Sequence, residues 1–184
     1  DSIKYEQDLM QRYNHGELTS ADSIHFPDSL KTYTKRLGRP VYGGGGIMPD
    51  YFVPLDTMRY TKYHRALAAK GSIIQASLRY LDENRQQIEK QYSDIYDFEE
   101  RFEVDSTYLA MLREQGDKDN VTLEGGEEEY EKSLPELKRQ LKHLIARDIW
   151  NMDKFMEIYN RTNDMFLKAY EIVKDKKFEK LMKK

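Results

Sequence analysis

The 184-residue sequence contains no cysteine. Without thiols the chain forms no disulfide, and it offers neither a thiolate nucleophile nor a zinc site built on thiolates. Long hydrophobic runs are also missing, since no apolar stretch approaches the length of a membrane span. We therefore expect no membrane insertion of this chain, while the lack of cysteine is compatible with reducing and oxidising compartments alike.

An excess of charge of one sign is lacking as well. The sequence has 30 basic and 33 acidic residues, interleaved almost everywhere, for a formal net charge of -3. Because no broad positive face results, we expect no nucleic acid partner. The last eleven residues are rich in lysine, but cations suit the C-terminal end of a helix, which favours a solvated helix end over attraction to a membrane.

The most informative feature present is a glycine run, in a stretch that reads V-Y-G-G-G-G-I-M-P-D-Y-F-V-P over residues 41–54. Four consecutive glycines lose much backbone entropy on ordering, so a fold that keeps them needs bare backbone there. Val41-Tyr42 and Tyr51 to Val53 predict two short extended segments, joined by the glycines and a Pro49-Asp50 turn. No G-K-[ST] follows the run, which favours backbone packing over a phosphate cradle.

The segment from Gly45 to Val53 resembles the G-G-I-x-P-D-x-x-V stretch near the end of the catalytic core in carboxyl-terminal processing peptidases, the bacterial tail-specific serine proteases. Three further segments resemble the larger members, which carry a long helical C-terminal extension: Arg12 to Glu17, Asp22 to Ile24, and Leu144 to Trp150. By this resemblance, the structural signature residues of the family are Gly45, Gly46, Ile47, Pro49 and Asp50.

The resemblance implies a periplasmic parent enzyme that cleaves proteins near their C-termini with a Ser-Lys dyad. In that family the dyad lies in a G-x-x-[ST]-x-G-K-G-like stretch, and this sequence has none. We therefore expect the dyad and the substrate-gripping PDZ domain to lie upstream. The portion in hand is then non-catalytic and needs no cofactor, and its partners are protein or peptide substrates, reached through the parent enzyme. Its own role is packing, self-association or substrate shielding.

The residues themselves indicate no local catalytic or metal site. No serine has a lysine at the S-x-x-K spacing, and no G-x-S-x-G elbow occurs. The histidines, which are scattered and never at zinc-site spacings, are His15, His25, His64 and His143. The acidic stretch from Glu124 to Glu131 lacks the alternating order of a calcium loop and indicates a solvated helix start. We predict no catalytic, cofactor-binding or metal-binding residue.

We predict a mainly α fold with a small β portion, in two domains. Residues 1–57 carry a helix from Ile3 to Tyr13, closed by Gly16, followed by short strands at the end of a larger sheet. That part is the terminal portion of the peptidase catalytic core. Residues 58–184 change to a helical period and form a C-terminal helical bundle.

Capping residues predict where the helices begin and end. Gly71-Ser72 opens a long helix, Ser93 caps a short one that buries Ile95, Phe98 and Phe102, and Asp105-Ser106 caps a third that Gly116 ends. The apolar stripe of the long helix is Ile74, Leu78, Leu81, Ile88 and Tyr92.

The C-terminal half of the predicted bundle follows a polar loop over Asp117 to Gly126. Ser133 to Glu136 has the S-x-x-E form of a capping box, which predicts a helix starting there with proline in its first turn. Asn160 to Asp164 predicts a break between the last two helices.

A rival hypothesis treats the chain as a stand-alone helical module that binds other proteins and has no peptidase parent. The sequence has 14 tyrosines, and Tyr51, Tyr60 and Tyr63 lie near the predicted domain junction. Such rings suit an interface and the edge of a core equally well.

Overall fold

The computed structural model describes residues 7, 11–12, 14–17, 19–24, 28–43 and 51–178. The chain divides into two compact units, one of residues 58–163 and one that combines residues 1–57 with 164–184. The first boundary falls where the helical period begins in the sequence, whereas the predicted helical domain 58–184 reaches beyond the helical unit. The mainly α fold with a small β portion is confirmed, with the two described strands preceding residues 58–163 in the chain.

In its described residues, the unit that contains the N-terminal region holds two short strands and the C-terminal helix α8, and residues 7, 11, 12 and 14 are also helical. Its elements are the 3-10 helices η1 (Ala21–Ser23) and η2 (Asp28–Leu30), the strands β1 (Lys31–Tyr33) and β2 (Pro40–Tyr42), and the helix α8 (Asp164–Lys174). The strands form an antiparallel two-stranded sheet. The strand predicted at Val41-Tyr42 is confirmed, whereas Tyr51 to Val53 join no strand. Most of the helix predicted from Ile3 to Tyr13 lies outside the described residues.

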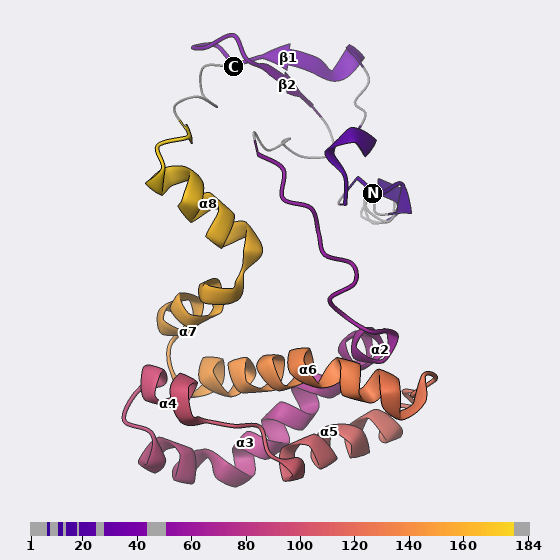
Figure 1. Ribbon diagram of the computed structural model, residues 1–184, viewed down its shortest axis with the longest axis vertical. Coiled ribbons are helices and arrows are strands. Elements are labelled where there is room, and N and C mark those ends of the chain that lie inside the picture. The colour runs from indigo at the N-terminus through magenta and orange to yellow at the C-terminus, as the bar shows by residue number, and fades with distance from the viewer. Residues whose placement is uncertain are drawn as a thin grey trace. The chain divides into compact units, whose positions relative to one another are not determined.

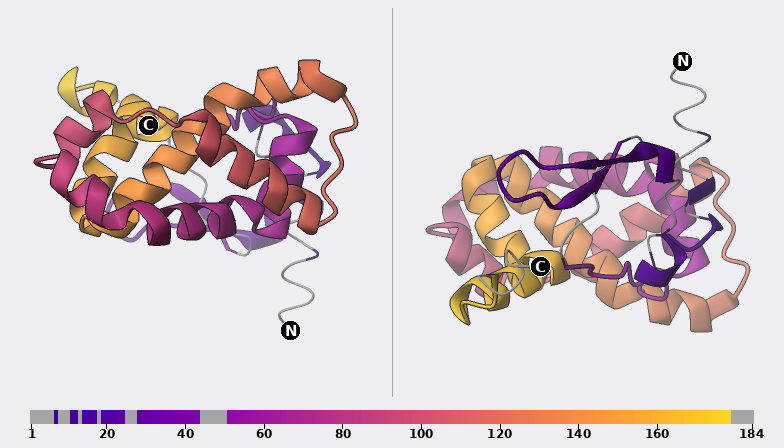
Figure 2. Two further views of the ribbon diagram at one scale, coloured as in Figure 1. Left: turned by 90° about the horizontal axis from the view of Figure 1, so that it is seen from below. Right: turned by 90° about the horizontal axis from the view of Figure 1, so that it is seen from above.

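The helical unit is built from six α-helices and one 3-10 helix in its described residues. They are α2 (Lys62–Lys70), α3 (Ser72–Gln91), α4 (Ile95–Arg101), α5 (Ser106–Lys118), α6 (Gly126–Ile149), α7 (Met152–Tyr159) and η3 (Asn160–Thr162). Figure 1 shows α6 running above α3 and α5, and Figure 2 shows the same helices from below and from above. Helix α3 contacts α2, α5 and α6, and α6 contacts α2, α3, α4 and α7, so these two helices together form the centre of the packing.

Aromatic rings from five helices and the turns beside them fill this core. Tyr80 of α3 stacks on Tyr108 of α5 with ring centroids 3.9 Å apart, and the Tyr108 hydroxyl donates to the Leu141 carbonyl oxygen of α6 at 3.4 Å. Phe98 of α4 stacks on Phe102 at 4.4 Å. Burial of such rings removes large apolar areas from water and dominates the stability of a domain of this size.

Helix α3 buries a different face from the predicted one. Ile74 and Leu78 keep 45% and 41% of their surface exposed, and the buried residues are Ser72, Ile73, Ala76, Ser77, Tyr80, Leu81 and Ile88. The predicted stripe was therefore wrong at Ile74 and Leu78 and right at Leu81, Ile88 and Tyr92. The small residues Ala76 and Ser77 are both 1% exposed and share the buried face of α3 with Ile73 and Tyr80, and Ile74 lies off that face.

Two predicted helix boundaries need correction. Asp94, rather than Ser93, caps α4, because its carboxylate accepts from the backbone N–H groups of Tyr96 and Asp97, both at 2.9 Å. Gly116 does not end α5, which continues to Lys118. A Cβ at Gly116 would lie 2.8 Å from Leu67 Cδ2, so glycine is needed there for close packing of α2 on α5.

Helix α6 begins a full two turns before the predicted capping box. It starts at Gly126, and Ser133 and Pro135 therefore lie inside it. Ser133 caps nothing, because its hydroxyl donates to the Glu129 carbonyl oxygen one turn back, at 2.7 Å. The same early start shortens the predicted polar loop, which extended from Asp117 to Gly126.

The other predicted helix limits agree with the structure. Gly71 separates α2 from α3 with φ at 76°, a left-handed conformation that suits glycine. Asp105 caps α5 by accepting from Tyr108 N at 2.8 Å, and the 3-10 turn η3 interrupts the last two helices at the predicted break. Within the described ranges, none of the helices is long and apolar enough to span a bilayer.

Candidate functional site

Five polar side chains follow one line along α6, at alternating spacings of four and three residues: Glu129, Ser133, Glu136, Gln140 and His143. This spacing places them on one face of a helix. The line, called here the α6 polar row, lies beside the apolar residues of α6 that face the core. Sequence reasoning missed it, although a polar residue at every third or fourth position was a visible signal.

The α6 polar row binds α2 and the segment just before it. Glu129 accepts from the backbone N–H of Tyr63 at 3.0 Å, and the Thr61 and Ser133 hydroxyl oxygens lie 2.6 Å apart. Glu129 also accepts from Gly125 N at 2.9 Å, which satisfies the backbone where α6 begins. These bonds connect the start of α2 to the first third of α6.

Two further contacts extend this attachment. Arg59 Nε lies 3.2 Å from Glu136 Oε1, and Gln140 Oε1 lies 2.8 Å from His64 Nε2. Because an amide oxygen only accepts, His64 Nε2 carries the proton and Nδ1 does not. His64 is 3% exposed, and its Nδ1 is buried with no hydrogen-bond partner among the described residues.

Burial decides the protonation of both histidines of this region. Desolvation lowers the pKa of His64, against the smaller opposing effect of its bond to Gln140. The pKa of His143 falls to about 4, first through burial and then through the nearby cations of Arg139 and Lys142. The His143 ring packs edge-on against Phe155 and Tyr159 of the α7 segment. Both imidazoles are therefore neutral at pH 7.

Ser133 is the buried serine of the α6 polar row, and its geometry is that of a structural hydroxyl. Its proton points to the Glu129 carbonyl oxygen, and Thr61 donates to its oxygen. A nucleophilic serine needs a base that takes its proton, such as a neutral lysine. Four lysines have shifted pKa values, and all four are raised, which keeps them charged: Lys132, Lys154, Lys168 and Lys177.

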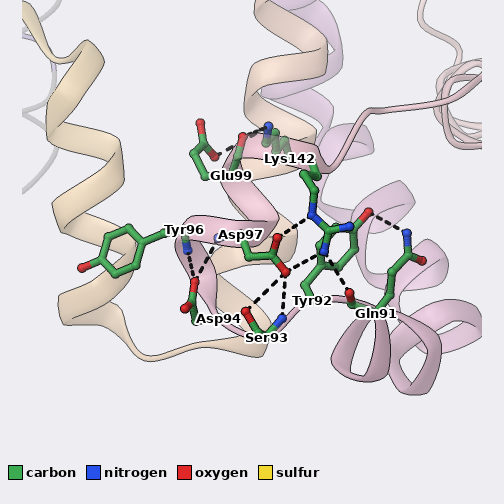
Figure 3. A network of polar contacts seen from close by, with 9 residues as sticks. Gln91, Tyr92, Ser93, Asp94, Tyr96, Asp97, Glu99 and Lys142 are labelled. Atoms are coloured by element: carbon green, nitrogen blue, oxygen red, sulfur yellow. Dashed lines mark hydrogen bonds and ion pairs between the residues drawn. The ribbon is translucent and has the colours of Figure 1, made fainter.

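A second polar cluster stabilises the turn between α3 and α4, called here the α3–α4 corner (Figure 3). The guanidinium of Arg101 donates through Nε and Nη2 to the two oxygens of Asp97, and Nη2 also donates to the Gln91 carbonyl oxygen at 3.1 Å. Asp97 further accepts from Ser93 N at 3.0 Å. These bonds, with Arg101 foremost, lower the pKa of Asp97 strongly.

The same corner is tied to α6 by Lys142. Its ammonium donates to the Glu99 backbone oxygen and lies 3.9 Å from Glu99 Oε2 (Figure 3). Burial raises the pKa of Glu99, and the charge of Lys142 opposes this rise. Glu99 Oε2 is buried without a hydrogen-bond partner among the described residues, so its contact with the Lys142 charge across the two helices is electrostatic.

The family signature residues predicted from the glycine run all lie outside the described residues: Gly45, Gly46, Ile47, Pro49 and Asp50. Of the other segments that carry the resemblance, Arg12 and Glu17 form an ion pair at 2.7 Å beside Gly16, whose φ is 79°. The described residues contain no group of three histidine, aspartate or glutamate side chains placed to hold a metal ion.

Residues 63–151 match the model of a family of unknown function (DUF8443). The matched segment begins at the second residue of α2 and ends just after α6, so it contains the α6 polar row, the α3–α4 corner and most of the aromatic core. No curated protein matches the chain. No solved structure matches it either.

Proposed function

We propose that the chain is the C-terminal portion of a carboxyl-terminal processing serine peptidase, and that residues 58–163 form a non-catalytic domain that packs against or binds other protein surfaces. The peptidase parent rests on the segments of the sequence that resemble this family. The non-catalytic role rests on one observation: the buried hydroxyl of Ser133 donates to a backbone oxygen and accepts from Thr61, with its proton directed away from any base.

An exposed apolar stripe supports the binding role. Met152, Met156 and Tyr159 of α7 recur at four and three residues and keep 55%, 39% and 38% of their surface exposed. Methionine and tyrosine adapt well to a partner surface, and grouped apolar residues on a protein surface mark sites of contact with other proteins. The stripe is equally what a stand-alone interaction module would need, so it favours this second candidate as well.

The catalytic part of the proposal is tested on the purified chain. We expect no hydrolysis of peptide substrates and no labelling of any serine by a fluorophosphonate probe, followed by mass spectrometry. A labelled serine within residues 1–184 would overturn the non-catalytic role, because it would reveal an activated hydroxyl.

The parent enzyme is tested on the natural polypeptide that contains this sequence. Antibodies raised against the chain should recover from cells a longer protein that trims peptides from the C-terminal end and loses this activity when its upstream serine is replaced by alanine. Recovery of a polypeptide without peptidase activity would favour the stand-alone module. In either case, Met152→Glu with Met156→Glu should reduce the proteins recovered with it, whereas Asp153→Asn, at an exposed residue of the same helix outside the stripe, is the control.

A further inference from the structure

The two edges of the small sheet present different backbone groups. Gly43 N donates to Leu30 O at 2.8 Å, and Thr34 N donates to Arg39 O at 2.9 Å. In an antiparallel pair, hydrogen-bonded residues alternate with residues whose backbone groups point away from the partner strand. With the register Thr32 opposite Val41, the backbone groups of Lys31 and Tyr33 therefore point outward from β1.

The outward edge of β1 has all its backbone N–H and C=O groups, whereas the outward edge of β2 lacks one N–H. Lys31 and Tyr33 each present one N–H and one C=O, and no group in the described part of the chain bonds to them. On β2 the outward position opposite Tyr33 is Pro40, which has no N–H. Proline at such a position blocks the addition of a strand, as it does on the edges of natural sheets. A third strand is therefore accommodated by β1 alone.

The charges around β1 select the partner. Residues 28–43 carry four cations, Lys31, Lys35, Arg36 and Arg39, against one acid, Asp28. A second copy of the same hairpin would bring like charges together, which disfavours pairing between two β1 edges. An extended segment rich in acidic residues would place opposite charges across the new ladder instead.

Exposed apolar groups of the hairpin provide the remaining contact. Tyr33 is 60% exposed, and no residue of β1 is buried. Because a two-stranded hairpin is marginally stable alone, a third strand that covers Tyr33 would stabilise it as well as bind to it. Main-chain bonds give affinity in this mode of recognition, and alternate side chains give specificity.

We propose that the outward edge of β1 binds an extended acidic segment of another polypeptide, which joins the sheet as a third strand next to Lys31 and Tyr33. Backbone bonds to these two residues hold the segment, and the surrounding lysines and arginines set its charge. The proposal is independent of any peptidase parent.

The test uses the whole chain and a fluorescent peptide of alternating glutamate and threonine, with a lysine and threonine peptide as the comparison. Fluorescence anisotropy should show binding of the acidic peptide at low salt and much weaker binding of the basic one. In ¹⁵N spectra the amides of Lys31 and Tyr33 should shift and become protected from exchange. Equal binding of the two peptides, or shifts confined to the helical unit, would refute the proposal.

Two matched proline variants separate the edges. Tyr33→Pro removes an outward N–H from β1 and should lower the affinity for the acidic peptide at least about tenfold, which corresponds to about 1.4 kcal/mol. Tyr42→Pro removes an outward N–H from the β2 edge instead. It should change the affinity for the acidic peptide by no more than about twofold, because the peptide makes no bond to β2. Equal losses in both variants would show that β1 is not the binding edge.

A charge reversal keeps the proposal testable if Tyr33→Pro disturbs the hairpin. The double variant Lys31→Glu and Lys35→Glu should no longer bind the acidic peptide and should bind the basic one, and the backbone spectra of β2 should be unchanged. An unchanged preference would refute the choice of an acidic partner. Sedimentation of the chain alone gives a further check, because a dimer formed through β1, and not displaced by the acidic peptide, would make a second copy the occupant and overturn the proposal.

Discussion

Gly116 occupies the point where α5 passes closest to α2, and its missing side chain makes room for Leu67. Besides the Leu67 methyl group at 2.8 Å, a Cβ would meet the Tyr63 hydroxyl at 3.7 Å and the Val121 Cβ at 3.9 Å. Since Leu67 is fully buried, its methyl group has little space into which to move.

We expect Gly116→Ala to lower the free energy of unfolding. Alanine favours a helix over glycine by about 1 kcal/mol, but overpacking a core costs about 1–3 kcal/mol, so the net loss should be about 1 kcal/mol. Urea denaturation measures it. In a Leu67→Ala background the same substitution should be neutral or stabilising, because the obstructing methyl group is gone. A gain in stability in the wild-type background would contradict this account of the packing.

His143 should make the helical unit sensitive to acid. Its pKa is lowered to about 4 in the folded chain, against 6.5 as the ordinary value. The unfolded chain therefore binds a proton first, and the stabilisation present above pH 6.5 is lost as the pH falls from 6.5 to about 4. One group over this window contributes up to about 3 kcal/mol. His64, whose pKa is lowered too, should add to the loss in the same direction.

Denaturation series at successive pH values test this expectation. His143→Phe, which keeps an aromatic ring against Phe155 and Tyr159, should flatten the pH dependence between 6.5 and 4. His15→Gln changes an exposed histidine and serves as the control for replacement of a histidine. A slope unaffected by His143→Phe would assign the acid sensitivity to other groups.

At the scale of single residues, the sequence predicted the buried side chains correctly where a helix has a single apolar face. Ile95, Phe98 and Phe102 are buried as predicted, because a short helix with three large side chains has one face to bury. In α3 the doublet Ile73 and Ile74 offered two possible faces. The larger apolar residues favoured the face with Ile74, which was wrong. The buried face contains small residues, and whether small residues fit between helices depends on the neighbouring helices rather than on the sequence of α3.

At the scale of elements, α6 shows how tertiary packing can override local signals. Pro135 has no N–H to donate to the Glu131 carbonyl oxygen one turn back, so the sequence around it looks like a helix start. The helix nevertheless runs through it, because Tyr130 and Ser133 before the proline and Leu137 after it are all buried. The capping residues Gly71 and Asp105 were predictable because their effect is local. The spacing of the α6 polar row was visible in the sequence, but its contacts with Thr61, Tyr63 and His64 were not predictable, since they join residues more than sixty positions apart.

Replacing Pro135 should strengthen α6. Pro135 is exposed, so Pro135→Ala removes little packing and restores a backbone bond inside the helix. We expect the free energy of unfolding to rise by about 1–3 kcal/mol, with more helical signal in circular dichroism. Pro54→Ala, outside the helices, is the matched control and should leave stability nearly unchanged. Loss of stability in Pro135→Ala would mean that the proline shapes α6 in a way the fold depends on.

At the scale of the whole molecule, the helical unit has its own core, since among the described residues every fully buried large side chain lies between Leu67 and Ile158. The polypeptide 58–163 should therefore fold on its own and unfold in one cooperative transition, as small domains do. Its midpoint should lie within a few degrees of the corresponding transition of the whole chain. Circular dichroism and calorimetry measure both. A polypeptide 58–163 without cooperative unfolding would show that residues 1–57 or 164–184 are needed for its core.

The contacts of the α6 polar row also fix how the helical unit should respond to tension. Arg59, Thr61 and Tyr63 come one after another along the chain and meet Glu136, Ser133 and Glu129 in reverse order along α6. Tension applied through Met58 therefore loads these contacts in succession, the Arg59 ion pair first. Detachment of α2 should proceed by peeling at low force, while the aromatic core between α3, α5 and α6 stays assembled.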